Sequence, residues 1–167
     1  MKNYMKLEIA AISENEGFAR SAVAAFALTL NPTLTELSDI KTAVSEAVTN
    51  CVVHAYGKGD SPRGQDNKIY IECQTETFAN PLSGDKKGAI HITIADSGCG
   101  IEDIDRATTP FFTTLRGEER SGMGFTIMQT FMDEFSVTSE KGKGTQVFMK
   151  KLVGETAQEE IRERINA

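Results

Sequence analysis

Apolar and polar residues alternate in five short segments of this chain, and a period of two residues predicts half-buried β-strands. These segments cover residues 5–9, 69–74, 90–95, 135–139 and 146–150. The second and third predict one β-hairpin. The last two flank the turn sequence Lys141-Gly-Lys-Gly and predict another.

Three further segments repeat their apolar residues every three or four positions, which predicts amphipathic helices. Capping-box sequences open the first two helices, Ser13-x-x-Glu16 and Thr33-x-x-Glu36. The first helix should end at Pro32, and the second should run to about Tyr56. The third predicted helix covers residues 125–132.

These elements predict an α/β two-layer sandwich: a mixed, mainly antiparallel sheet with about three helices on one face. We expect one domain over residues 1–152 and a charged C-terminal tail over 153–167. Two polar loops, 57–67 and 80–88, should lie away from any pocket. Residues 101–121 lack a clear period and precede the third helix, which predicts a lid.

Composition narrows the possible functions. A net charge of −6 argues against nucleic acid as the main partner, because binding phosphates needs a basic surface. The chain has no apolar run near the ~20 residues of a membrane span and no signal-peptide pattern at its start, so we expect a cytoplasmic protein. Its cysteines are three in number and form no C-x2-C pair, which argues against disulfides and a zinc site.

Glu46, Asn50 and His54 follow one another at intervals of four on the second predicted helix. This spacing places a carboxylate, an amide and an imidazole on one side of the helix, opposite its apolar stripe. An amide oxygen can hold Mg²⁺ together with phosphate oxygens, and a carboxylate one turn earlier can accept a proton. A solvated helix face is the alternative interpretation of Glu46 and Asn50, and His54 alone favours packing or capping.

Asp96 follows a predicted strand and precedes two glycines, so its carboxylate should sit at the strand end, where it could accept from an exocyclic amine such as that of adenine. An ordinary Asx turn is the alternative. Gly122 and Gly124 precede the third helix, whose N-terminal N–H groups could meet phosphate, although a plain linker explains them nearly as well. Gly144-Thr145 alone is an ordinary hairpin turn.

Taken together and in this order, these pieces resemble the four nucleotide-binding boxes of the GHKL, or Bergerat-fold, ATPases. The resemblance covers about residues 5–150. The match is narrower with the sporulation anti-sigma serine kinases of that family, which four stretches resemble: 15–20, 45–50 with His54 and Tyr56, 112–114, and 120–128.

This resemblance implies a homodimer that uses ATP and Mg²⁺ to phosphorylate a serine of an anti-anti-sigma protein and that sequesters a sporulation sigma factor of the sigma F type. It implies that Glu46 is the catalytic base, Asn50 the magnesium ligand and Asp96 the adenine acceptor. The other nucleotide contacts that it implies are His54, Gly98, Gly100, Thr114, Ser121, Gly122, Met123, Gly124 and Thr145.

Two arginines are candidate partner-binding residues. Arg20 lies on the first predicted helix, whose outer surface should meet the sigma factor. The family resemblance leads us to expect an arginine just before Pro110, where this chain has threonines, so Arg106 or Arg116 would take that role.

Several other functions stay open. A kinase acting on another stress-response sigma factor and a non-catalytic ATP-sensing module are the main rivals, and Glu46 weighs against the second. A two-component histidine kinase domain is disfavoured because His54 and His91 are the only histidines, and neither lies on a preceding dimerisation helix. A non-nucleotide α/β domain is the last alternative.

Overall fold

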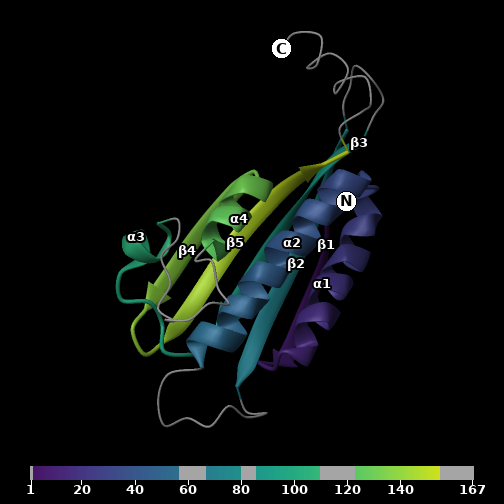
Figure 1. The fold of residues 1–167 in the computed structure, drawn as a ribbon. Helices are drawn as coiled ribbons and strands as arrows, with labels where there is room; N and C mark the ends of the chain where they lie inside the picture. The colour runs from purple at the N-terminus through teal and green to yellow at the C-terminus, as the bar shows by residue number, and fades with distance from the viewer. Residues whose placement is uncertain (1, 57–66, 80–85, 110–122, 155–167) are drawn as a thin grey trace.

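One layer of the molecule is a five-stranded sheet with the strand order β1-β2-β3-β5-β4 (Figure 1). The computed structural model describes residues 2–56, 67–79, 86–109 and 123–154. The strands are β1 (Lys2–Ala10), β2 (Lys68–Ala79), β3 (Lys86–Asp96), β4 (Glu134–Glu140) and β5 (Gly144–Val153). All five predicted strands are therefore confirmed.

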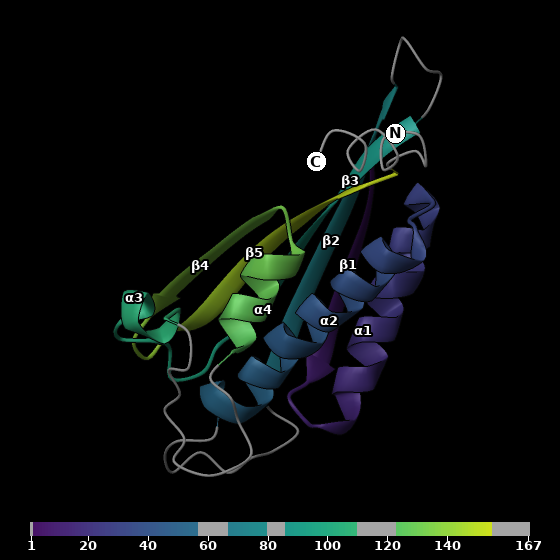
Figure 2. The same ribbon diagram turned by 45° about the horizontal axis from the view of Figure 1, so that its top comes forward.

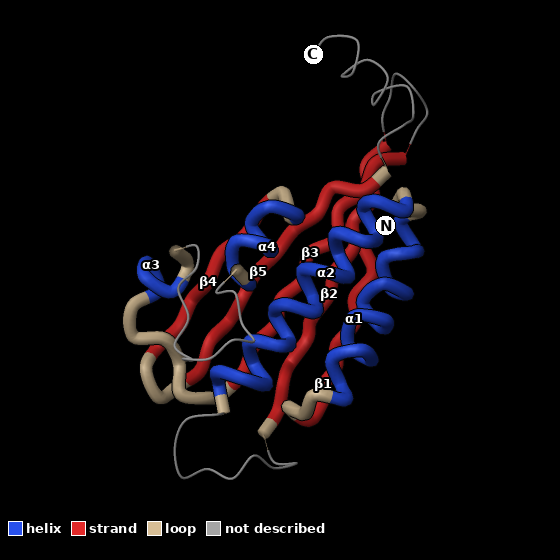
Figure 3. Tube along the Cα trace, viewed as in Figure 1, coloured by secondary structure: helices blue, strands red, loops and turns tan. Residues whose placement is uncertain are grey.

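The second layer consists of helices on one face of the sheet (Figures 2 and 3). The long helices are α1 (Glu14–Ala27), α2 (Leu34–Asn50) and α4 (Gly124–Phe131). α2 packs against α1 on one side and α4 on the other. The predicted α/β two-layer sandwich with three covering helices is confirmed. A single extra turn, α3 (Ile104–Ala107), lies near β4 in a stretch where no period predicts a helix.

Every strand pairing that the structure describes is antiparallel, so the mixed component predicted for the sheet is not found. Both predicted hairpins are present. β5 inserts between β3 and β4, an order that local alternation cannot reveal. The β2–β3 ladder continues to the pair Ala79 and Lys86, so β3 begins inside the stretch predicted as loop 80–88. Backbone pairing needs no alternation of side chains, which explains the underestimated strand lengths.

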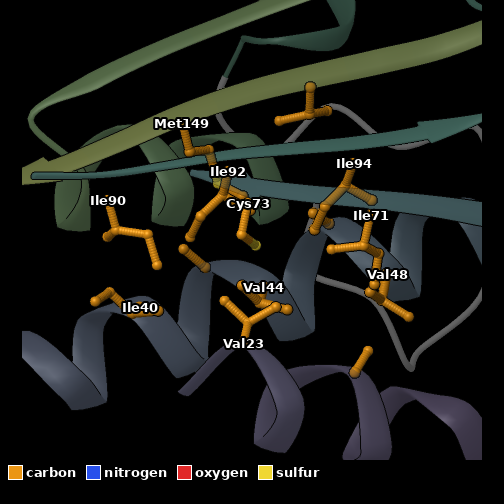
Figure 4. Close-up of a cluster of buried hydrophobic side chains, with 14 of the residues drawn as sticks. Val23, Ile40, Val44, Val48, Ile71, Cys73, Ile90, Ile92, Ile94 and Met149 are labelled. Atoms are coloured by element: carbon orange, nitrogen blue, oxygen red, sulfur yellow. The ribbon is translucent and has the colours of Figure 1, made fainter. Parts of the chain in front are cut away.

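The hydrophobic core fills the space between the two layers (Figure 4). The inward residues of β2 and β3, at every second position, meet the apolar stripe of α2. Fully buried members include Val23, Ile40, Val44, Val48, Ile71, Ile92 and Met149. At about 25 cal/mol per Å² of apolar surface, this burial is the main force that holds α2 on the sheet. The polar side of α2 is thereby turned away from the sheet.

The two predicted capping boxes have different outcomes. At α2 the Thr33 side chain accepts a hydrogen bond from the Glu36 N–H, and the Glu36 carboxylate accepts one from the Thr33 N–H. At α1 the predicted box is wrong: Ser13 makes no side-chain cap hydrogen bond. The Glu16 carboxylate instead accepts from Ser45 of α2 and from Arg20. A contact with α2 and an ion pair within α1 therefore hold the acid that the capping box requires.

Both helices end near the predicted positions. α1 tightens into a 3₁₀ turn, η1 (Leu28–Leu30), just before Pro32. α2 widens into a π-helical turn, η2 (Cys51–Ala55), and stops at Tyr56. No helix among the described ranges is long and apolar enough to cross a membrane. Val153, the first residue of the predicted tail, is buried as the last residue of β5, and residues 155–167 lie outside the described part.

Candidate nucleotide site

Glu46 and Asn50 of α2 face the first residue of α4. A Cβ atom built on Gly124 would lie 3.2 Å from Glu46 Oε2 and 3.2 Å from Asn50 Oδ1. The i, i+4 spacing brings the two side chains together, and the packing of α2 against α4 brings them to a helix N-terminus. A carboxylate, an amide oxygen and the N-terminal end of a helix at one point suit a phosphate-bearing ligand with its metal ion.

The side chains of Glu46 and Asn50 limit the kind of metal ion that the site could bind. Within the described residues, no group of three His, Cys, Asp or Glu side chains gathers to bind a metal ion. Mg²⁺ commonly takes only one or two protein ligands and completes its octahedron with phosphate oxygens and water. The Asn50 amide oxygen therefore fits a magnesium ion that arrives on a nucleotide.

His54 lies in the π-helical turn η2, one turn beyond Asn50. Its backbone carbonyl accepts a hydrogen bond from the Cys99 thiol at 3.3 Å. The neighbouring Ala55 carbonyl accepts from the Cys99 N–H at 2.9 Å. The turn therefore connects the end of α2 to the loop after β3. π-turns inside helices are frequent at functional sites.

Asp96 is the last residue of β3, and its side chain is buried, as the predicted position at a strand end implies. Its Oδ1 atom accepts two backbone hydrogen bonds, from Gly98 N–H at 2.9 Å and from Thr145 N–H at 3.3 Å. The first closes the Asx turn that the sequence offered as an alternative. The second joins the loop to β5, so the structure brings Asp96, Gly98 and Thr145 together.

Gly98 and Gly100, which follow Asp96, lie so close to other backbone segments of the protein that neither position has room for a side chain. A Cβ atom on Gly98 would overlap the Ala55 carbonyl, and one on Gly100 would overlap the Glu140 carbonyl. Gly100 also has a φ of 68°, a value that favours glycine. Close packing against η2 and β4 therefore accounts for both positions.

Thr145 is held by more than its bond to Asp96. Its hydroxyl lies 2.9 Å from the Ser139 hydroxyl. The Ser139 hydroxyl also accepts a hydrogen bond from the Ile101 N–H at 2.7 Å. Sequence analysis missed Ser139, because alternation assigns it to the inner face of a strand and says nothing about its partner. This serine couples the loop after Gly100 to the β4–β5 hairpin.

Two buried groups beneath the loop have shifted acidities. Burial raises the pKa of Asp96 above its usual value, although hydrogen bonds from Gly98, Cys51 and Thr145 oppose the shift. Burial, with the nearby Asp96 charge, raises the pKa of the Cys51 thiol well above its usual value. Cys51 is therefore a neutral donor beside the carboxylate, a role that sequence analysis missed because it considered only disulfides and zinc for the cysteines. All three cysteines are free thiols.

Three further predicted residues, Met123, Arg20 and Arg106, lie in the described part of the chain. Met123 is the N-cap of α4, next to Gly124. Arg20 lines an open hollow of about 360 Å³ between α1 and α2, together with Lys41 and Ser45. Arg106 lies on α3 and is exposed. Three predicted nucleotide contacts, Thr114, Ser121 and Gly122, and the alternative arginine Arg116, fall outside the described residues.

The described residues thus combine an antiparallel sheet covered by helices with a side-chain pair that faces a helix N-terminus. The model of the histidine kinase-like ATPase domain matches residues 9–151, and the chain belongs to this family. The fold agrees with that of the RsbU and RsbW domains of a Mycobacterium tuberculosis protein, with a TM-score of 0.57 and 13% identity. That match covers 93% of this chain and 34% of the longer one.

Curated relatives extend over nearly the whole chain. An anti-sigma F factor of Thermoanaerobacter sp. (strain X514) is 53% identical over 152 residues, which cover 91% of this chain and 95% of the relative. An anti-sigma F factor of Geobacillus sp. (strain WCH70) is 48% identical, with coverages of 92% and 94%. One of Clostridium perfringens (strain SM101 / Type A) is 49% identical, with coverages of 90% and 97%.

Proposed function

We propose that this protein is a cytoplasmic anti-sigma factor with serine kinase activity: it sequesters a sporulation sigma factor of the sigma F type and phosphorylates an anti-anti-sigma protein with MgATP. The observation that carries the kinase proposal is the convergence of Glu46 and Asn50 on Gly124. The anti-sigma part rests on relatives with about half of their residues identical.

In the proposed reaction the ATP phosphates lie between α2 and the start of α4, with the γ-phosphate exposed to the partner protein. The seryl oxygen of the partner attacks the γ-phosphorus, its proton passes to the Glu46 carboxylate, and the bond to the β-phosphate oxygen breaks to release ADP. A positioned base contributes roughly 10²–10⁴-fold to such a transfer. The distance of 3.2 Å between Glu46 Oε2 and a Cβ built on Gly124 supports this role for Glu46.

Asn50 would hold the magnesium ion through Oδ1. Bound Mg²⁺ neutralises part of the phosphate charge. Gly124 and Met123 would present backbone N–H groups to the phosphates, together with Ser121 and Gly122 from the preceding segment. Because Gly124 has no side chain, the ends of Glu46 and Asn50 can lie close to the backbone at the start of α4.

At the other end of the site, Asp96 would accept a hydrogen bond from the adenine amine. Oδ1 already accepts from Gly98 and Thr145, so Oδ2 is the oxygen that would serve adenine. Four further residues complete the proposed nucleotide contacts: His54, Gly98, Gly100 and Thr114. Thr145 would act beside them through its bond to Asp96.

Arg20 and Arg106 would each contact one of the two partner proteins. Arg20 lines the hollow between α1 and α2 and is kept in place by the Glu16 carboxylate at 3.2 Å. An acidic side chain of the sigma factor would fit beside Arg20 and Lys41. Arg106, exposed on α3, would contact the anti-anti-sigma protein. We propose that the working unit is a homodimer.

Glu46→Gln and Asn50→Ala test this function as a pair. We expect Glu46→Gln to bind MgATP with nearly normal affinity and to lose roughly 10²-fold or more of its transfer rate to the partner serine. Asn50→Ala should lose magnesium-dependent ATP binding itself. Calorimetry for binding and radiolabelled ATP for transfer measure the two effects separately.

Transfer that survives in Glu46→Gln would show that another group is the base. Tight MgATP binding by Asn50→Ala would overturn the metal assignment. A wild-type protein that binds ATP but phosphorylates nothing would support the ATP-sensing module in place of the kinase.

A further inference from the structure

Tyr56 is the residue at which α2 and its π-helical turn end, and its side-chain hydroxyl contacts two backbone groups. The hydroxyl donates a hydrogen bond to the Lys68 carbonyl at 2.7 Å. It accepts one from the Ser97 N–H at 2.9 Å. One side chain from the helix layer therefore connects the beginning of β2 with the residue that follows β3.

The position of this bridge in the sheet gives it a specific effect. The β2–β3 ladder ends at the pair Ile69 and Asp96, and the same register would place Lys68 opposite Ser97 as the next pair. The Tyr56 hydroxyl occupies the hydrogen-bonding groups of that next pair. The hairpin consequently opens at its end, and the chain after Asp96 is turned out of the sheet.

The backbone groups that Tyr56 binds lie next to Asp96, in the part of the candidate site that would bind adenine. Ser97 lies between Asp96 and Gly98, and the Gly98 N–H binds Asp96 Oδ1. A shift of the Ser97 N–H would move the neighbouring Gly98 N–H and change the direction of the carboxylate. The Ala55 carbonyl, one residue before Tyr56, holds the same loop through the Cys99 N–H at 2.9 Å.

The chemical state of Tyr56 suits this role. The ring is half-buried between the helix end and the strand ends. Burial raises the pKa of Tyr56 above its usual value, so the hydroxyl stays protonated at neutral pH and can donate to Lys68. Without the hydroxyl, the Lys68 carbonyl and the Ser97 N–H would pair directly or turn to water.

We propose that Tyr56 is a positioning residue for adenine specificity: by holding the β2–β3 hairpin open between Lys68 and Ser97, it aims the Asp96 carboxylate at the amine of the base. This inference rests on the proposed function, because it requires ATP at the site. It adds a residue that makes no contact with the nucleotide and acts only through the strand ends.

The test compares Tyr56→Phe with wild type in binding two nucleotides, ATP and purine riboside triphosphate, which lacks the 6-amino group. We expect wild type to prefer ATP. In Tyr56→Phe the affinity for ATP should fall about tenfold, as expected for one lost hydrogen bond, and the affinity for the analogue should stay the same. The preference for ATP would then disappear. Tyr70→Phe, an exposed tyrosine on β2, is the matched control and should behave as wild type.

The outcomes separate this inference from the function on which it rests. If Tyr56 had only a structural role, Tyr56→Phe would bind both nucleotides more weakly by the same factor, or would only have a lower melting temperature. Either result would overturn the proposal. Unchanged ATP preference in Tyr56→Phe would overturn it as well. If wild type binds neither nucleotide, the proposed function fails first, and with it the requirement for adenine recognition.

Discussion

The two ends of the candidate site are built in different ways. The base end, which would bind the adenine base, consists of Asp96, the loop 97–100 and Thr145. Backbone hydrogen bonds hold it to η2 and β5. The phosphate end consists of Glu46, Asn50 and Gly124, where two side chains face a helix N-terminus. The base end is therefore formed by the fold itself, whereas the phosphate end depends on side chains whose ends can move.

This difference indicates how the two ends would contribute to binding. A preformed base end loses little conformational freedom when a purine enters, which favours affinity and specificity. Side chains at the phosphate end can adjust as a metal and phosphates arrive, at the cost of ordering them. Substitutions at the base end should therefore act on folding and specificity, and those at the phosphate end on binding and catalysis.

The largest effect is expected from Gly98→Ala. The added Cβ would overlap the Ala55 carbonyl, and backbone cannot move aside cheaply. We expect the free energy of unfolding to fall by about 3 kcal/mol and the melting temperature by about 6–12 °C. Thermal unfolding followed by circular dichroism measures the change. Gly17→Ala, in α1, is the control: its Cβ would only touch Arg20 Nη2 at 4.0 Å, and the substitution should stabilise by about 0.5–1 kcal/mol.

The same substitution at the phosphate end sharpens the contrast. A Cβ on Gly124 would meet only the ends of Glu46 and Asn50, which can shift. Gly124→Ala should change the stability by less than about 1 kcal/mol and weaken MgATP binding about tenfold. A destabilisation as large as that of Gly98→Ala would contradict the distinction between a rigid and an adjustable end.

Asp96→Asn should separate stability from nucleotide binding at the base end. Because burial raises the pKa of Asp96, its ionised form costs stability at neutral pH, and this cost is relieved as the pH falls through the raised pKa. The neutral amide avoids this cost, so the variant should be at least as stable as wild type at neutral pH. Its affinity for ATP should fall about tenfold or more.

Chemical unfolding of wild type and Asp96→Asn at several pH values checks whether the ionised Asp96 carboxylate lowers or raises the stability of the fold. The stability advantage of Asp96→Asn should shrink as the solution is acidified, because wild type then protonates Asp96. An advantage that grows on acidification would show that the carboxylate is stabilised in the fold, and that its hydrogen bonds outweigh burial.

The smallest effect lies far from both ends, at the cap of α2. Thr33→Ala removes the side chain that accepts from the Glu36 N–H, and should cost about 1 kcal/mol without changing ATP affinity. Ser13→Ala is the matched control, since Ser13 makes no cap hydrogen bond at α1. Equal losses from the two substitutions would show that the α1 cap forms in solution.

Sequence patterns predicted the local elements well and the contacts between them poorly. The stripe of α2 and the alternation in β2 and β3 correctly identified the elements that form the core. The position of β5 between β3 and β4 was not predictable, because many strand orders bury the same inward residues. Local signals cannot choose between them.

The candidate site divides in the same way. The spacing of Glu46 and Asn50 placed both on one helical face, as the structure bears out. The spacing could not predict the roles of Tyr56 and Ser139, because a hydroxyl shows its partners only once distant strands are in place. Two capping signals of the same type also had different outcomes, since the Glu16 carboxylate accepts hydrogen bonds from Ser45 and Arg20.

The sequence by itself determined the fold class, the helix and strand positions and the residue types of a nucleotide site, because these depend on periods and spacings within a few residues. Only the tertiary structure decided that Gly124 lies opposite Glu46 and that Tyr56 holds the end of the β2–β3 hairpin open. These contacts join residues about 12 to 80 positions apart, and packing against a shared core sets their distances.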